Sequence, residues 1–226
     1  MGLTVVPGTM IEDGTVTDSN FTNTTITSAD MAVDPRDADN LSSGSVPLAQ
    51  LGNVPAVDTG DVDNDLATLG FNIAATDSLA KYNLVNQTVD AFEDASGVDA
   101  AASTNETRNA ANYYSGTQSD MTLVSTATAA AAIPTKGDMV MTYTNGAGTA
   151  VINTNIKGYV SRDGGTTYTQ GTLATGNTIG GHIILSFHDL DISGQPSGSS
   201  MRYKIETLVQ SAALTTRIQA VSLGWS

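Results

Sequence analysis

The strongest constraint on the fold is a regular alternation of short apolar runs and turn-forming residues across residues 137–226. Runs rich in β-branched and aromatic residues are separated there by clusters of Gly, Asp, Ser and Pro. Repetition at intervals of about ten residues is typical of antiparallel strands joined by tight turns. The segment therefore predicts a mainly β chain ending in an antiparallel β-sandwich of the jelly-roll type. We expect strands at 139–144, 151–160, 166–169, 183–188, 201–209 and 218–225, with Asn145-Gly146 as the turn that closes the first.

Charge and composition narrow the classes of function. The chain of 226 residues carries 9 Lys and Arg against 23 Asp and Glu, a net charge of −14. Such a surface repels nucleic-acid phosphates and anionic lipid, so we expect binding to neither nucleic acid nor membrane. The chain has no cysteine, which excludes disulfides, thiolate metal sites and cysteine nucleophiles.

Residues 1–56 show a different periodicity, with apolar residues five positions apart. A period of five fits neither a helix nor a strand. It fits an extended arm that contacts neighbouring subunits at intervals, or a stacked, solenoid-like coil. Pro35, Pro47 and Pro55 favour the arm, because proline limits ladder pairing. The predicted anchoring residues of this arm are Val6, Ile11, Val16, Phe21, Ile26 and Met31.

Residues 57–136 are predicted to connect the arm to the sandwich and to contain one short helix at 76–96. Thr76 or Asp77 is a suitable N-cap, and Gly97 stands where a helix stop belongs. Apolar residues at three- and four-residue intervals form one stripe. Two interpretations remain open: the stripe packs on its own domain, or it forms a self-association seam around a symmetry axis. The candidate oligomer-interface residues are Tyr82, Val85, Val89 and Phe92.

The acidic segment before this helix is predicted to be a solvated turn. Asp61, Asp63 and Asp65 have the alternate spacing of a calcium loop. Leu66 stands where that loop requires glycine, and Asn72 stands where it requires glutamate. We therefore expect no metal site.

The residue pattern does not indicate catalytic chemistry. His182 and His188 are the two histidines, and we interpret His188 with Asp189 and Asp191 as a surface pair. The chain contains no G-x-S-x-G, and its glycine-rich stretch 176–181 lacks the lysine of a phosphate loop. The sequence leaves open whether two of the acidic residues form the carboxylate pair of a glycosidase. The sequence predicts no enzyme, no catalytic residue and no cofactor.

The segment SRDGGTTY fits the pattern S-x-D-x-G-x-T-aromatic and resembles the Asp-box of sialidase-like propellers, in which the motif is structural. A propeller needs several copies, and the pattern occurs once here. We expect a stable hairpin in which Asp and Ser cap turn amides, glycine permits positive φ and the aromatic ring packs beneath. The structural hairpin residues are Ser161, Asp163, Gly165, Thr167 and Tyr168.

Four segments are similar to sequence segments found in virion proteins of tailed bacteriophages: residues 89–116, 159–173, 190–208 and 217–226. The resemblance covers roughly residues 76–226. It implies a virion location and a β-rich module of a short tail fibre, head fibre or capsid-decorating protein. It also implies a homotrimer whose N-terminal arm attaches to other virion proteins, such as major capsid or tail proteins, and whose sandwich is displayed outward.

A carbohydrate-binding, lectin-like receptor-recognition module of a tail fibre is the alternative function. Host surface glycans would then be partners, because sugar faces stack on aromatic rings. Grouping of Tyr113, Tyr114, Tyr143 and Tyr168 on one exposed loop surface would favour this alternative.

Overall fold

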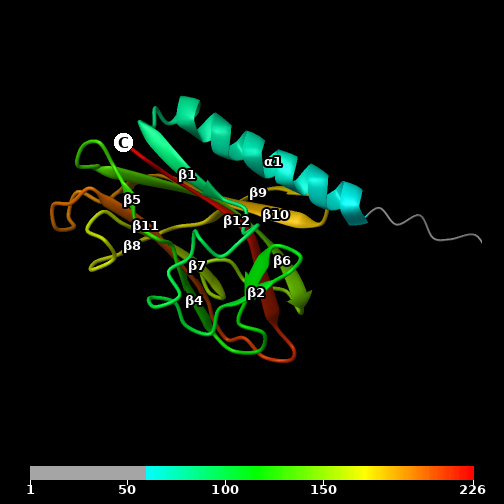
Figure 1. The fold of residues 1–226 in the computed structure, drawn as a ribbon. Coiled ribbons are helices and arrows are strands. Elements are labelled where there is room, and N and C mark those ends of the chain that lie inside the picture. The colour runs from blue at the N-terminus through cyan, green and yellow to red at the C-terminus, as the bar shows by residue number, and fades with distance from the viewer. Residues whose placement is uncertain (1–59) are drawn as a thin grey trace, which may run out of the picture. The chain divides into compact units, whose positions relative to one another are not determined.

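The computed structural model describes residues 60–226, in which one helix accompanies twelve strands (Figure 1). The helix α1 spans Gly60–Lys81. The strands are β1 (Asn86–Asp90), β2 (Thr107–Asn109), β3 (Tyr113–Ser115), β4 (Met121–Val124), β5 (Thr128–Ala129), β6 (Lys136–Ala147), β7 (Ile156–Ser161), β8 (Thr169–Gly171), β9 (Ala174–Ile179), β10 (His182–Asp191), β11 (Ser200–Thr207) and β12 (Thr215–Trp225). Among residues 60–226, no helix has the length and apolarity needed to span a membrane.

The strands form two antiparallel sheets. The seven-stranded sheet has the order β2-β3-β12-β6-β10-β9, and β1 also pairs with β12. The five-stranded sheet has the order β4-β11-β7-β8, and β5 also pairs with β11. The predicted mainly β fold, an antiparallel sandwich accompanied by a helix, is confirmed for the described part of the chain.

The main core lies between the two sheets. Met139, Met141 and Tyr143 alternate along β6 and point inward, and each is at most 3% exposed. Met201 and Tyr203 of β11 face them from the five-stranded sheet and are equally buried. Each such side chain contributes about 1.5–3 kcal/mol through its removal from water.

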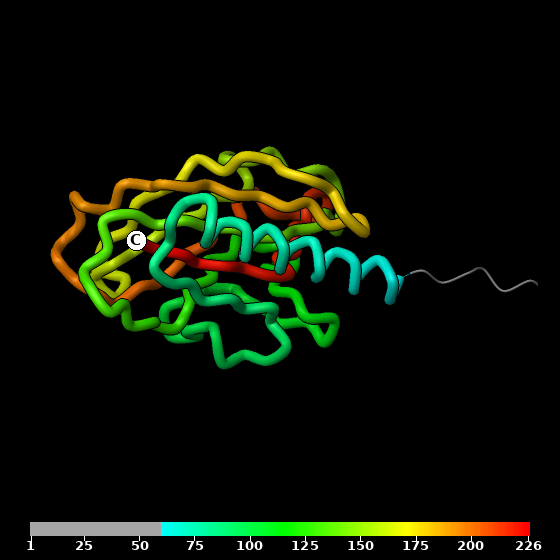
Figure 2. The backbone as a smooth tube through the Cα atoms, turned by 90° about the horizontal axis from the view of Figure 1, so that it is seen from above, coloured from blue at the N-terminus to red at the C-terminus, as the bar shows by residue number. Residues whose placement is uncertain are grey.

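The helix α1 covers the outer face of the seven-stranded sheet, and Figure 2 shows it running roughly along the strands. Asn64 near its start contacts His182, and Tyr82 just after its end stacks on His188, so α1 follows the course of β10. Phe71 packs there against Val140, Ile184 and Ala220, which form a second, smaller apolar cluster. Strand β6 is thus covered on both faces, by the sandwich core and by α1. This double cover explains why seven consecutive residues of β6, 137–143, are buried.

The sandwich begins well before residue 137, where the sequence predicts its start. Strands β1 to β5 belong to the same two sheets as the later strands, and contacts group Asp58–Ser226 into one unit. β1 pairs with the end of β12, with Asn86 opposite Trp225 and Asp90 opposite Val221. Residues 86–136 therefore contribute strands to both sheets, and they are more than a connection.

The helix lies earlier than the predicted range 76–96, and the prediction of its position was wrong. Asn83 has a φ of 52°, a left-handed conformation that ends a helix, and the Leu84 N–H donates back to the carbonyl of Leu79. The β-branched Thr88 and Val89 then enter strand β1. The acidic Asp61 and Asp63, predicted to form a turn, lie in the first turn of α1, where the helix dipole favours negative charge.

Several predicted strand limits also differ from the structure. The strand expected at 166–169 is β8 at Thr169–Gly171, because residues 163–167 form the hydrogen-bonded turn before it. Asn145 and Gly146 form no hairpin turn, because β6 continues through them to Ala147 and pairs with β12. The predicted strand 151–160 begins only at Ile156, since residues 151–155 form a turn closed by the bond from the Asn155 N–H to the Val151 carbonyl.

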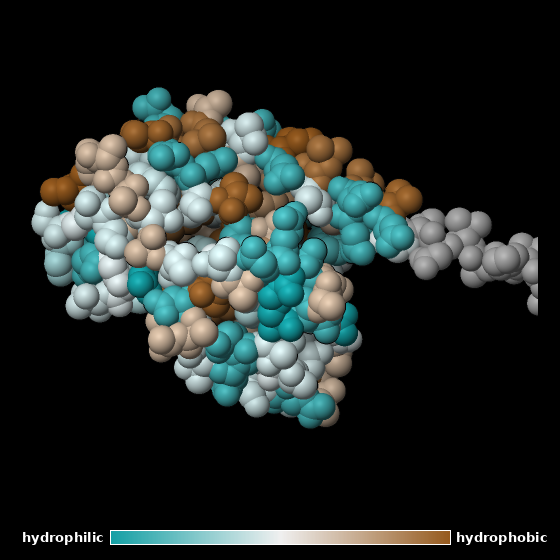
Figure 3. Space-filling model, in the orientation of Figure 1, coloured by the Kyte–Doolittle hydropathy of each residue, from teal (hydrophilic) through white to brown (hydrophobic). Residues whose placement is uncertain are grey.

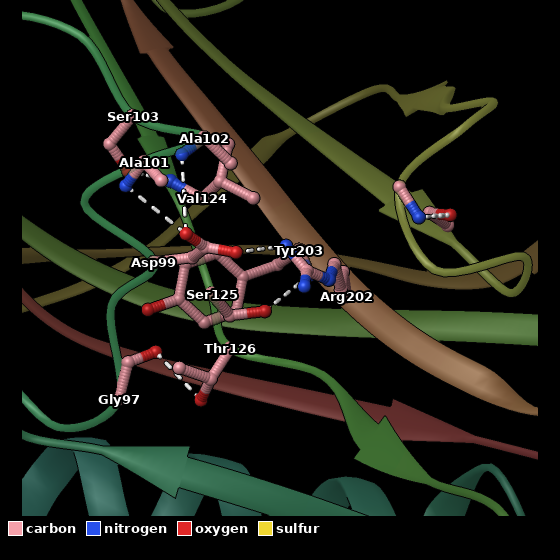
Figure 4. Close-up of polar contacts among 12 residues, drawn as sticks. Gly97, Asp99, Ala101, Ala102, Ser103, Val124, Ser125, Thr126, Arg202 and Tyr203 are labelled. Carbon is pink, nitrogen blue, oxygen red and sulfur yellow. Dashed lines mark hydrogen bonds and ion pairs between the residues drawn. The ribbon is translucent and has the colours of Figure 1, made fainter.

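A polar network fastens the connection after β1 to the five-stranded sheet (Figure 4). One oxygen of Asp99 accepts hydrogen bonds from the backbone amides of Ala101 and Ala102, and the other lies 2.7 Å from Nη1 of Arg202 on β11. The hydrogen bond from Arg202 is the main cause that lowers the pKa of Asp99. The Ser103 hydroxyl accepts a hydrogen bond from the Val124 amide of β4.

Candidate functional sites

Helix α1 has two apolar faces that point in opposite directions. Its inner face, which lies on the sheet, carries Ala67, Phe71, Ala75 and Ser78. Its outer face carries a stripe of large apolar side chains that are about half exposed or more, and Figure 3 shows apolar side chains gathered where α1 runs. We call these residues the outer stripe: Val62 (64% exposed), Leu66 (49%), Leu69 (55%) and Ile73 (53%).

The residues predicted to form an oligomer seam share no helix face. Tyr82 follows the helix, Val85 lies in the connection to β1, and Val89 is part of β1. Phe92 is fully buried, with a φ of 56° and its ring edge-on to Tyr114 at 4.9 Å. The prediction of a seam made of these four residues was therefore wrong, because the chain changes direction at Asn83 and again at Phe92.

His188 belongs to a partly buried cluster whose members the sequence did not indicate. Its Nδ1 lies 2.9 Å from Oδ2 of Asp138, which is 2% exposed, and Tyr82 stacks on its ring at 3.8 Å. The other Asp138 oxygen accepts the Asp189 N–H, which holds a β-bulge in β10. From the sequence, His188 is expected to form a surface pair with the nearby Asp189 and Asp191. The structure assigns its partner to β6, 50 positions away.

A cleft of about 440 Å³ lies beside this cluster, between α1 and the edge of the seven-stranded sheet. Ile73, Ala74 and Asp77 line it from α1, and Ser186 and His188 line it from β10. With Asp138 holding Nδ1, the Nε2 of His188 is the remaining ring nitrogen for a hydrogen bond. The cluster also ties the C-terminal end of α1 to β6 and β10.

A smaller groove of about 290 Å³ lies where β2, β3 and β12 meet. The Tyr113 ring forms one wall, with the guanidinium of Arg217 at 5.2 Å from its centroid. Asn109, Gln118 and Thr215 supply polar groups around the ring. An aromatic face surrounded by hydrogen-bonding side chains has the chemistry to hold a polyhydroxylated ligand.

The other tyrosines, whose grouping with Tyr113 on one loop surface would favour a sugar site, lie elsewhere. Tyr114 and Tyr143 are each 3% exposed and belong to the core. Tyr168 lies near Lys204 on the outer side of the five-stranded sheet, together with Tyr159. The four tyrosines therefore do not form one exposed group, and that argument for the glycan-binding alternative is absent.

The S-x-D-x-G-x-T segment joins β7 to β8 as an antiparallel hairpin. The Ser161 hydroxyl donates to Asp163 at 2.7 Å and accepts the Gly165 N–H at 2.9 Å. The Asp163 carboxylate also accepts the backbone N–H of Thr167 at 3.0 Å and its hydroxyl at 2.7 Å. Gly165 has a φ of 92°, and a Cβ there would lie 2.8 Å from the Tyr168 hydroxyl. All five predicted hairpin residues thus lie together in one hydrogen-bonded turn.

Arg162 holds a second loop against this hairpin. Its side chain is buried at 6% exposure, and its guanidinium donates to the carbonyls of Pro134, Ser193, Gln195 and Pro196. In the S-x-D-x-G-x-T pattern, Arg162 occupies a variable position. Its neighbours in the sequence gave no signal of these distant carbonyl partners.

Two further predictions concern the acidic segment and the arm. Within residues 60–226, no group of three or more His, Asp or Glu side chains is placed to hold a metal ion. Residues 1–59, which include the proposed anchoring positions Val6, Ile11, Val16, Phe21, Ile26 and Met31, lie outside the described residues.

No protein-family model matches this chain, and no curated protein matches it. Among the solved structures that match is a family two carbohydrate esterase from Cellvibrio japonicus, with a TM-score of 0.34 and 10% identity over 62% of this chain. The match spans 34% of the esterase chain, about a third of its length. Another is TmCBM61 in complex with β-1,4-galactotriose, with a TM-score of 0.29 and 9% identity, covering 66% of this chain and 94% of that chain. Both TM-scores lie below 0.5, so neither match carries an argument about activity.

Proposed function

We propose that this chain is a non-enzymatic structural protein of a tailed-bacteriophage virion, a capsid-decorating or short-fibre component. It assembles as a homotrimer, attaches to major capsid or tail proteins through its N-terminal arm, and displays the sandwich outward. This proposal is supported by sequence similarity to segments of virion proteins, which is found at residues 89–116, 159–173, 190–208 and 217–226.

The observation that carries the proposal is the concentration of exposed apolar surface on α1. Of the nine large apolar side chains most exposed in residues 60–226, four lie on the outer face of this one helix. Exposed apolar patches of this kind mark protein–protein contacts. A helix that is packed on the sandwich on one side and apolar on the other suits a subunit of a larger assembly.

Immunogold electron microscopy tests the virion proposal directly. Antibodies raised against residues 60–226 are applied to purified particles of the phage whose genome encodes the chain, and the particle proteins are identified by mass spectrometry. Regular labelling of the capsid assigns a decorating protein, and labelling of the tail assigns a fibre component. Absence of the chain from washed, infectious particles would refute the proposal.

Glycan binding is the second candidate function, and the Tyr113 groove is the observation that favours it. The partly exposed Tyr113 ring, the Arg217 guanidinium and the amides of Asn109 and Gln118 line one surface. Stacking on the ring and hydrogen bonds from the amides are the interactions that a sugar ring requires.

A glycan array tests this second function. We expect binding of the full chain to at least one class of host polysaccharide, and loss of about tenfold or more in affinity on Tyr113→Ala. Tyr159→Ala is the matched control, since Tyr159 lies on the other sheet under Lys204. Equal binding by the two variants would exclude the groove, and no binding by the parent chain would exclude the function.

A further inference from the structure

The outer stripe of α1 has the spacing of a coiled-coil seam. Val62, Leu66, Leu69 and Ile73 follow one another at intervals of four, three and four residues, and Thr76 and Ala80 continue the series at three and four. Alternation of three and four keeps side chains on one line of a supercoiling helix. In heptad notation, Leu66, Ile73 and Ala80 occupy a positions, and the other three occupy d positions. All six residues are exposed, and none is charged.

The opposite side of the helix holds the sandwich. Ala67, Phe71, Ala75 and Ser78, which contact the sheet, occupy b, f, c and f positions of the same heptads. The seam therefore faces away from the sandwich, and a second helix is able to dock on it without displacing α1. Helices paired in this way leave each sandwich on the outside of the bundle.

The helix is also held in place before any partner arrives. A free helix of about three heptads is marginal in water, because its ordering costs more than its own hydrogen bonds return. Phe71 and the stacked Tyr82–His188 pair already fix α1 on the sheet. Association then does not have to order the helix as well, which lowers the free-energy cost that the short seam has to overcome.

We propose that the outer stripe is the self-association surface, and that its occupant is α1 of a second copy of this chain in parallel orientation. This inference rests on the proposed structural role and names the partner for it. A heptad-spaced stripe fits another heptad-spaced helix, and α1 is the only α-helix in residues 60–226.

The parallel orientation follows from the proposed trimer, because copies related by a threefold axis run in the same direction. In a parallel pair, each g position faces the e position five residues later on the partner helix. Asp65 then faces Gly70 of the second copy, and Asn72 faces Asp77. Neither pair joins two carboxylates, and neither joins opposite charges, so the apolar a and d side chains supply the attraction along the seam.

Sedimentation equilibrium of the full chain tests the proposal, with Leu69→Asp in the seam and Thr68→Asp as the matched control. Thr68 is the neighbouring exposed residue off the seam, so both variants add one charge to the same helix turn. We expect the parent and Thr68→Asp to form the same oligomer, with three times the 23.2 kDa chain mass as the proposed state. Leu69→Asp should raise the dissociation constant about a hundredfold or more, because it places a charge in a closed apolar seam.

A variant that is expected to strengthen association provides a second test, because a loss of association alone could come from misfolding. Thr76→Leu supplies the missing apolar side chain at a d position and should lower the dissociation constant about tenfold. Fluorescence of the buried Trp225 reports that each variant is folded.

A parent chain that stays monomeric at high concentration overturns the inference, as does an oligomer unaffected by Leu69→Asp and Thr76→Leu. Particle labelling by antibody does not depend on this seam. Its outcome therefore separates failure of the self-association surface from failure of the virion role.

Discussion

Replacement of Asp163 by Asn tests whether the hairpin between β7 and β8 depends on a charged acceptor. The Asp163 carboxylate accepts hydrogen bonds from the hydroxyls of Ser161 and Thr167, both at 2.7 Å, and from the Thr166 and Thr167 amides. Burial raises the pKa of Asp163, but the hydrogen bonds outweigh burial and lower the pKa from 3.8 to about 2.

A pKa that is lower in the folded state means that the ionised carboxylate stabilises the fold. The difference between 3.8 and about 2, at about 1.4 kcal/mol per pKa unit, gives an upper limit of about 2.5 kcal/mol. Asp163 is partly exposed, so solvent screening reduces the expected contribution to about 1–2 kcal/mol. The contribution is complete above about pH 4 and is lost as the pH falls from about 4 to about 2.

Urea unfolding of the parent chain and of Asp163→Asn at two pH values measures this contribution. The fluorescence of Trp225, the only tryptophan and 2% exposed, follows the sandwich core. At about pH 6.5 we expect the variant to be less stable by about 1–2 kcal/mol. At about pH 2.5 the difference should fall to about a third of that value, because most of the folded-state advantage of the charge is gone.

Thr167→Val is the control for the hairpin. It removes one hydroxyl donor and leaves the Asp163 charge and both backbone amides in place, so a smaller loss of about 0.5–1 kcal/mol is expected at about pH 6.5. The reasoning fails if Asp163→Asn is as stable as the parent at about pH 6.5. It also fails if the stability gap is the same at both pH values.

Two core substitutions give further predictions, both measured by the same unfolding assay. Asp138→Ala leaves the His188 ring nitrogen and the Asp189 backbone amide without their buried acceptor. We therefore expect the free energy of unfolding to fall by about 2–4 kcal/mol. A fall of less than about 1 kcal/mol would contradict the role of Asp138 in joining β6 to β10. Gly171→Ala places a Cβ 2.3 Å from the Phe187 ring and should cost about 1–3 kcal/mol. Gly194→Ala, whose Cβ meets nothing within 4 Å, should be nearly neutral, and equal losses in the two glycine variants would refute the packing argument.

Local patterns predicted the features that depend on neighbours in the sequence. The alternation of Met139, Met141 and Tyr143 with smaller residues indicated a strand, because side chains alternate between the faces of a sheet. The S-x-D-x-G-x-T spacing indicated the hairpin, since its hydrogen bonds join residues two to four positions apart. These signals needed no knowledge of the rest of the chain.

The position of the helix was misjudged because two signals competed. Leu66, Leu69 and Ile73 carry helical spacing, but the three aspartates that precede them, at 61, 63 and 65, favoured a turn. The left-handed Asn83 that ends the helix has no unique sequence signature. Heptad counting from Val62 would have revealed the outer stripe.

The sequence by itself determined the class of fold, an antiparallel β-sandwich with a helix, because strand alternation and turn chemistry are local properties. Only the tertiary structure decided which apolar stripe stays exposed. Phe71 is buried because the outer face of β6 and β10 lies beneath it, and Leu69, two positions earlier, is left on the free side. Similarly, Asp138 becomes the partner of His188 only when β6 and β10 pair. Burial and long-range pairing depend on which elements meet in space, and a local pattern does not contain that information.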